Sequence, residues 1–125
     1  MSNENNQSEN YLFTLTEFGT DTDRVATPLV LANSALASGK DVLLWLTMGG
    51  VELAKKHAAD ALIPKSFAPV RELLDTYVEN GGKIGVCPPC AKTHGVTDDN
   101  LIEHAELMGA VAMLDESAGR QTFSF

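Results

Sequence analysis

Short apolar, β-prone runs alternate with segments of helical periodicity along most of this chain. Residues 11–16 (YLFTLT) and 42–47 (VLLWLT) are almost continuously apolar, as in strands that are buried on both faces of a parallel sheet. Further β-prone runs lie at residues 83–87, 106–108 and 121–125. This alternation predicts a single-domain α/β fold with a mainly parallel sheet of about five strands flanked by helices.

Four segments between these runs have helical spacing. In the first, one apolar face ends shortly before Gly39, a residue typical of helix ends. Pro28 lies inside this segment. Because proline suits the first turn of a helix better than its interior, either Thr27 caps a helix that begins at Pro28, or a helix capped by Asp23 is kinked at Pro28.

The remaining helices are expected at residues 51–62, in a segment capped by Ser66 that stops at residues 80–82, and at residues 110–116. Residues 1–9 (MSNENNQSE) are polar, which predicts a disordered tail. The α/β domain is therefore expected to span residues 10–125.

Composition and charge exclude several classes of function. The net charge is −8 and the basic residues are scattered, which argues against binding to nucleic acid or to an anionic membrane. We find no apolar run of membrane-spanning length and no signal peptide, so a cytoplasmic protein is expected. The chain contains neither GxGxxG nor GxxxxGK[ST], and we expect no cofactor.

The two cysteines, Cys87 and Cys90, are the strongest candidates for a reactive site. Sites in open parallel sheets form at the carboxyl ends of strands, and Cys87 ends an apolar run. Pro88 suits the first position of a helix, which would make Cys87 its N-cap. A helix start favours the thiolate, so Cys87 is expected to react first and Cys90 to act as a resolving thiol.

The spacing of the cysteines alone leaves three kinds of chemistry open. The pair could carry sulfur, or it could act as a thiol–disulfide oxidoreductase, since CxxC is typical of that class. It could also bind a metal together with His94 and His104. A lone CxxC lacks the second half of a strong zinc pattern, so the metal-binding module ranks last.

Two stretches are similar to a known family. Residues 44–56 (LWLTMGGVELAKK) resemble the second-strand signature of the DsrE/DsrF/TusD-like family. Residues 86–96 (VCPPCAKTHGV) resemble the strand and turn that carry its active thiol. The resemblance extends from Tyr11 to the final Phe-Ser-Phe.

The resemblance implies a flavodoxin-like or Rossmann-like fold and a sulfur-relay function. In such proteins sulfane sulfur is passed between sulfur-donor and sulfur-acceptor proteins as a cysteine persulfide, and the matching thiol here is Cys87. The family also implies a homotrimer or homohexamer. We take Cys87 and Cys90 as catalytic, and we expect no resident metal. Expected substrate-binding residues at the strand ends and the following turn are Gly19, Thr20, Met48, Gly49 and His94.

Overall fold

The structure is a computed structural model that describes residues 10–125. Five parallel strands form one sheet in the order β4-β3-β2-β1-β5. They are β1 (Asn10–Leu15), β2 (Asp41–Leu46), β3 (Lys83–Val86), β4 (Ala105–Leu107) and β5 (Gln121–Ser124). The predicted α/β fold with a parallel five-stranded sheet is confirmed. The disordered tail predicted for residues 1–9 lies outside the described residues.

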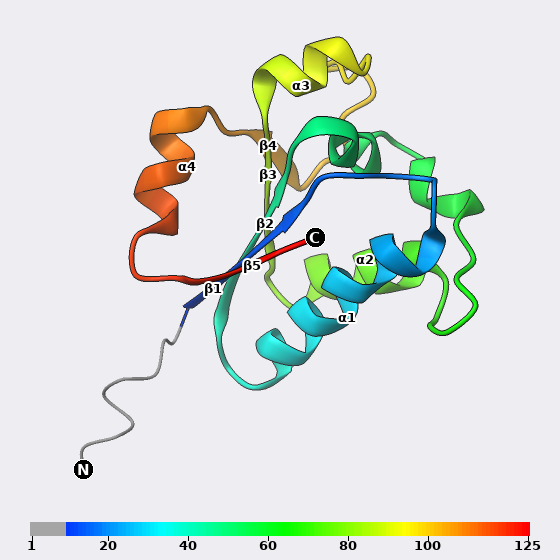
Figure 1. The fold of residues 1–125 in the computed structure, drawn as a ribbon, viewed down its shortest axis with the longest axis horizontal. Coiled ribbons are helices and arrows are strands. Elements are labelled where there is room, and N and C mark those ends of the chain that lie inside the picture. Colours follow the sequence, from blue (N-terminus) through cyan, green and yellow to red (C-terminus); the bar gives the residue numbers. More distant parts are fainter. Residues whose placement is uncertain (1–9) are drawn as a thin grey trace.

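Helices cover both faces of the sheet. Helices α1 (Thr22–Ala37) and α2 (Val70–Glu79) lie together on one side, and α4 (Ala110–Ser117) lies on the other (Figure 1). The short helix α3 (Pro88–Thr93) extends from the end of β3. The helix expected at residues 110–116 is therefore confirmed as α4.

The two faces of the sheet bury unequal cores. Toward α1 and α2, alternate strand residues such as Phe13, Leu44 and Ile84 join one large cluster. The other face has a smaller buried cluster with half-buried Trp45 and Met113 packed against it; its buried members are Leu12, Leu43 and Met108. Because β1 and β2 bury side chains on both faces, their sequences are almost continuously apolar.

Helix α1 begins earlier than either start considered from the sequence. Asp21 is its N-cap, and the Asp21 side chain accepts a hydrogen bond from the Asp23 amide. Pro28 is buried inside the helix. Both predicted caps, Thr27 and Asp23, are therefore wrong. The carboxylate of Asp21 already satisfies a free amide of the first turn.

The single helix expected at residues 51–62 is wrong. Two 3₁₀ helices occupy this region, η2 (Met48–Ala54) and η3 (Ala58–Ala61). Between them the backbone of Lys55 is extended and forms an antiparallel bridge with Leu101. Hydrogen bonds from Lys56 N–H to Asn100 O and from Ile102 N–H to Ala54 O complete this pairing. The backbone groups needed for a continuous helix are thus used by a distant segment.

The expected cap of α2 at Ser66 is also wrong. The helix begins at Val70, and Pro69 occupies the N-cap position. The Ser66 hydroxyl instead donates to the Asp23 carboxylate over 2.8 Å, and the Ser66 and Lys65 amides donate to it as well. These bonds hold the pKa of Asp23 below its ordinary value, with the Ser66 hydroxyl as the largest cause. The end of α2 before residues 80–82 is confirmed.

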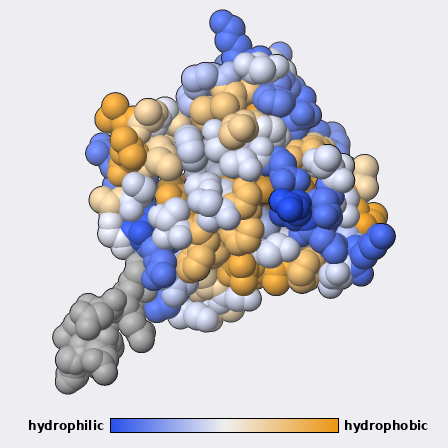
Figure 2. Space-filling view, viewed as in Figure 1, coloured by the Kyte–Doolittle hydropathy of each residue, from blue (hydrophilic) through white to orange (hydrophobic). Residues whose placement is uncertain are grey.

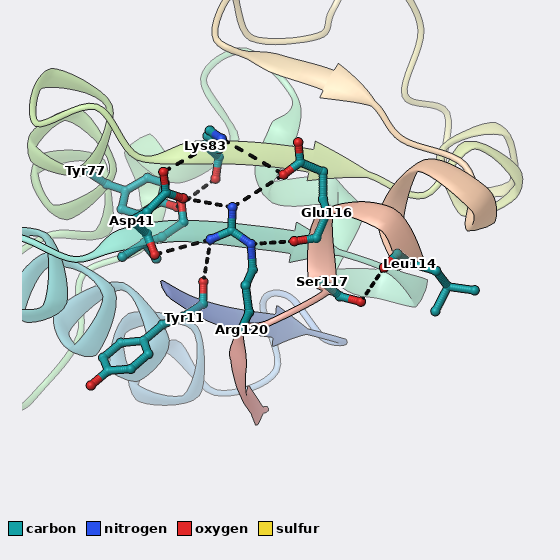
Figure 3. Close-up of polar contacts among 9 residues, drawn as sticks. Tyr11, Asp41, Tyr77, Lys83, Leu114, Glu116, Ser117 and Arg120 are labelled. Carbon is teal, nitrogen blue, oxygen red and sulfur yellow. Dashed lines mark hydrogen bonds and ion pairs between the residues drawn. The ribbon is translucent and has the colours of Figure 1, made fainter. Parts of the chain in front are cut away.

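Arg120 joins the amino-terminal ends of the strands. Its side chain is only 5% exposed and donates to the backbone carbonyls of Tyr11 and Asp41 and to the carbonyl of Glu116. It also pairs with the Asp41 carboxylate at 2.8 Å. Figure 3 shows this arrangement, in which Lys83 also lies near the carboxylates of Asp41 and Glu116. Arg120 therefore ties α4 and β5 to β1 and β2.

Candidate active site at the carboxyl ends of β2 and β3

The register of two neighbouring strands places Thr47 and Cys87 side by side. Leu46 and Val86, the last residues of β2 and β3, are paired in the sheet. The Cys87 amide donates to the Leu46 carbonyl over 2.9 Å, and the Thr47 amide donates to the Leu15 carbonyl at the end of β1. The residues that follow β2 and β3 therefore leave the same edge of the sheet.

Cys87 occupies the N-cap position of α3, and Pro88 is the first residue of this helix. The local geometry expected from the sequence is confirmed. The Cys87 carbonyl accepts a hydrogen bond from Ala91 N–H, but the Cys87 side chain makes no capping bond. Both cysteines are free thiols and half-buried.

The turn after β2 brings a hydroxyl group to the Cys90 sulfur. The hydroxyl of Thr47 lies 3.6 Å from the Cys90 sulfur, and this contact is the main reason why the pKa of Cys90 lies below its ordinary value. Partial burial acts in the opposite direction. The neighbouring Cys87 thiol and the backbone amide of Met48 also contribute to the lower pKa of Cys90.

The turn that carries Thr47 is packed tightly against the end of β1. A methyl group on Gly50 would overlap the Leu15 carbonyl, whereas one on Gly49 would make only ordinary contacts, the nearest being Thr16 O at 3.5 Å. Met48 adopts a left-handed conformation with φ of 52° and is exposed. Gly50 thus permits two backbones to approach closely. The exposed side chain of Met48 follows β2, at the same end of the sheet as the cysteines.

Gly19 and Thr20 lie in the exposed loop between β1 and α1. Gly19 has φ of 84° and open space around it. Within residues 10–125, no hydrogen bond connects either residue to the cysteines. Their expected role in substrate binding stays a prediction.

His94 is the C-cap of α3 and faces the turn after β2. Its Nδ1 atom lies 3.2 Å from Oε2 of Glu52, and Oε1 of the same carboxylate lies 3.4 Å from Lys55 Nζ. Sequence reasoning missed both Glu52 and Thr47. The one available signal was that Thr47 directly follows an apolar strand.

The ligand set considered for a metal is not brought together. Among residues 10–125, no group of three or more His, Cys, Asp or Glu side chains is placed to hold a metal ion. His104 instead lines a cavity of about 610 Å³ together with His57, Lys55 and Arg71. Neither cysteine lines this cavity. In the same described part of the chain, no helix is long and apolar enough to cross a membrane.

Comparisons with known proteins agree with this fold and its motifs. The chain is 33% identical over 112 residues to the protein MJ0989 of Methanocaldococcus jannaschii, covering 87% of this chain and 95% of the relative. It is 34% identical over 85 residues to MK0008 of Methanopyrus kandleri, covering 68% of this chain and 67% of that protein.

Two solved structures share the fold at low sequence identity. The ychN protein from E. coli superposes with a TM-score of 0.73 at 15% identity, covering 93% of this chain and 99% of that one. MTH1491 from Methanobacterium thermoautotrophicum gives a TM-score of 0.67 at 14% identity, covering 93% and 98%. Residues 9–118 match the DsrE/DsrF-like family. The chain therefore belongs to the DsrE/DsrF-like family.

Proposed function

We propose that this protein is a sulfur-relay protein that carries sulfane sulfur as a persulfide on Cys87. Membership of the DsrE/DsrF-like family indicates a sulfur-relay role in general. The observation that carries the proposal is a pair of free, half-buried thiols at the end of β3, where parallel sheets place reactive groups. No resident cofactor or metal is part of this proposal.

The proposed transfer is an exchange between thiols and persulfides. The Cys87 sulfur attacks the outer sulfur of a donor persulfide, and the donor sulfur–sulfur bond breaks. The donor leaves as a thiolate and takes the proton that Cys87 loses, so Cys87 becomes a persulfide. An acceptor thiolate then attacks the outer sulfur of Cys87 and releases the Cys87 thiolate. The partners are therefore a sulfur-donor protein and a sulfur-acceptor protein.

Intact-mass analysis after exposure to polysulfide tests the proposal. We expect the wild type to gain a sulfur atom, and peptide mapping to place it on Cys87. Cys87→Ser should abolish the adduct, whereas Cys90→Ser should keep it and lengthen its lifetime. An adduct that survives Cys87→Ser, or that maps to Cys90 in the wild type, would refute Cys87 as the carrier.

A thiol–disulfide oxidoreductase is the second candidate. It is favoured by the placement of two free thiols in one turn, since Cys87 is the N-cap of α3 and Cys90 lies in the first turn of this helix. The same mass analysis separates the two functions. An oxidoreductase would lose two hydrogen atoms on treatment with an oxidised dithiol and would gain no sulfur from polysulfide.

We also propose that the chain assembles as a homotrimer or homohexamer in the cytoplasm. Val111 and Leu114 of α4 are 76% and 65% exposed, and apolar surface is visible over this helix in Figure 2. Exposed apolar patches of this kind often mark contacts between proteins. Light scattering over a series of concentrations tests the assembly, and a monomer mass throughout would refute it.

A further inference from the structure

We infer that Thr47 is a positioning residue whose hydroxyl favours the thiolate form of Cys90, and that this thiolate resolves a persulfide on Cys87. The second half of this inference rests on the proposed function, whereas the first half does not. No sequence motif pointed to Thr47. Its assignment comes from the contacts of its hydroxyl group in the fold.

The Thr47 hydroxyl is available to bond with the Cys90 sulfur. Thr47 is the N-cap of η2, a position where threonine commonly bonds to an amide of the helix. Here its side chain makes no capping bond and lies 3.6 Å from the Cys90 sulfur instead. When Cys90 is a thiolate, it can only accept, so the hydroxyl must be the donor in this contact.

The backbone on both sides of this contact is fixed. Thr47 is held by the bond from its amide to Leu15 O and by the bond from Gly50 N–H to its carbonyl. Cys90 lies within α3, where its carbonyl accepts from His94 N–H. The two side chains therefore meet without reordering of either segment, and preorganised donors stabilise a charge most effectively.

The Cys87 side lacks comparable donors. The first residues of α3 are Pro88 and Pro89, which have no N–H groups. The Cys90 sulfur, in contrast, lies 3.6 Å from the Thr47 hydroxyl. Hydrogen bonds to a charged form favour that form, so the Thr47 hydroxyl favours the thiolate of Cys90.

Cys90 in this state has a defined reaction with a loaded Cys87. The Cys90 thiolate attacks the inner sulfur of the Cys87 persulfide, and a Cys87–Cys90 disulfide forms. The bond to the outer sulfur breaks, and that sulfur leaves as hydrosulfide with its proton and the electron pair. The sulfane sulfur is thus reduced by two electrons and the cysteines are oxidised. An external dithiol must then reduce the disulfide.

The effect of Thr47 on the reactivity of Cys90 has a predictable direction. A lower pKa raises the fraction of Cys90 present as thiolate at neutral pH by more than it lowers its nucleophilicity, because the Brønsted coefficient for thiol exchange is only about 0.4–0.5. Removing the hydroxyl should therefore slow the reactions of Cys90 at neutral pH.

Alkylation with iodoacetamide across a pH series, followed by peptide mapping of each cysteine, tests the first half of the inference. Thr47→Val and Thr47→Ala should move the Cys90 profile to higher pH, and Thr47→Ser should restore it. Thr93→Val is the matched control, since the Thr93 hydroxyl donates to Pro89 O in the same helix.

Unchanged Cys90 profiles in Thr47→Val and Thr47→Ala would overturn the inference. Single-turnover release of sulfide from polysulfide-loaded protein tests the second half. We expect Thr47→Val to release sulfide more slowly than the wild type at neutral pH, with the difference vanishing at high pH. Equal release rates would refute the resolving role. Absence of any persulfide would refute the proposed function while the alkylation result still stands.

Discussion

The imidazole of His94 and the carboxylate of Glu52 lie 3.2 Å apart and join α3 to η2. This pair is the second link between the two segments, besides the contact of Thr47 with Cys90. Both side chains are about one-third exposed, at 31% and 37%. Their attraction is therefore partly screened by solvent.

A double-mutant cycle on this pair should show weak, salt-sensitive coupling. With Glu52→Ala, His94→Ala and the double variant, we expect a coupling free energy below about 1 kcal/mol in urea unfolding at low salt. The coupling should fall toward zero in concentrated NaCl. Coupling that is absent at low salt would show that the pair does not help to dock α3.

Gly50→Ala should destabilise the protein far more than Gly49→Ala. An alanine methyl at Gly50 would overlap the Leu15 carbonyl, and neither backbone can move away without disturbing β1 or β2. We expect a loss of about 1–3 kcal/mol in the free energy of unfolding. Gly49→Ala, with its nearest contact at 3.5 Å, is the control and should change stability little. Similar losses for both variants would contradict the close approach.

Arg120→Lys should be costly although it preserves the charge. A lysine has no planar fork to serve the carbonyls of Tyr11, Asp41 and Glu116 together. We expect a loss of at least about 2 kcal/mol in urea unfolding, because buried acceptors would remain unpaired. Arg71→Lys is the control. Its ion pairs with Asp60 and Asp75 are half-exposed, and less than about 1 kcal/mol is expected. Equal losses would refute the importance of the Arg120 network.

Tyr77→Phe should remove one buried donor that two carbonyls share. The Tyr77 hydroxyl donates toward the carbonyls of Val42 and Lys83, at 3.2 and 2.6 Å, and the residue is fully buried. Loss of this buried hydrogen bond should cost about 1–3 kcal/mol. Tyr11→Phe serves as the control, and stability equal to wild type in Tyr77→Phe would contradict the role of the hydroxyl.

Tyr77 should also make stability fall at alkaline pH. Burial is the main cause that raises the pKa of its phenol well above the ordinary value, so the folded state keeps the proton after the unfolded state has lost it. The stabilising contribution is complete below the unfolded pKa, about 10, and is lost as pH rises above it. Urea unfolding at a series of alkaline pH values should show a shallower decline in Tyr77→Phe. A decline of the same slope would assign the alkaline loss to other groups.

Local pattern was sufficient to predict much of the fold. The apolar runs at β1 and β2 predicted strands buried on both faces, and these strands do contribute to both cores. The segment at residues 51–62 shows the limit of this approach. Its helical spacing is real, but the bridge from Lys55 to Leu101 competes for the backbone. A pairing between such distant residues leaves no trace in the local sequence.

The site could be predicted in position but not in detail. Cys87 follows an apolar run and precedes Pro88, which was sufficient to place it at the end of β3 and the start of α3. The sequence analysis assigned the thiolate to Cys87 from the helix start. The strongest donor in the structure comes from Thr47, which is adjacent only because Leu46 and Val86 share a register. Strand order is needed before such a contact can be foreseen.

The position of β1 in the sheet also constrains how the chain reaches its native state. β1 is synthesised first, and one of its edges can pair early with β2. Its other edge pairs with β5, the last strand of the chain, where Tyr11 lies opposite Gln121. Until β5 leaves the ribosome, one edge of β1 keeps unpaired backbone groups, and Phe13 lacks the ring of Phe123 that stacks on it at 5.3 Å. Nascent chains at this stage are open to wrong pairing with one another. Parallel pairing over long sequence separations is slow, so the pairing of β1 with β5 should be a late step of folding. It should also be the step that most needs protection by chaperones.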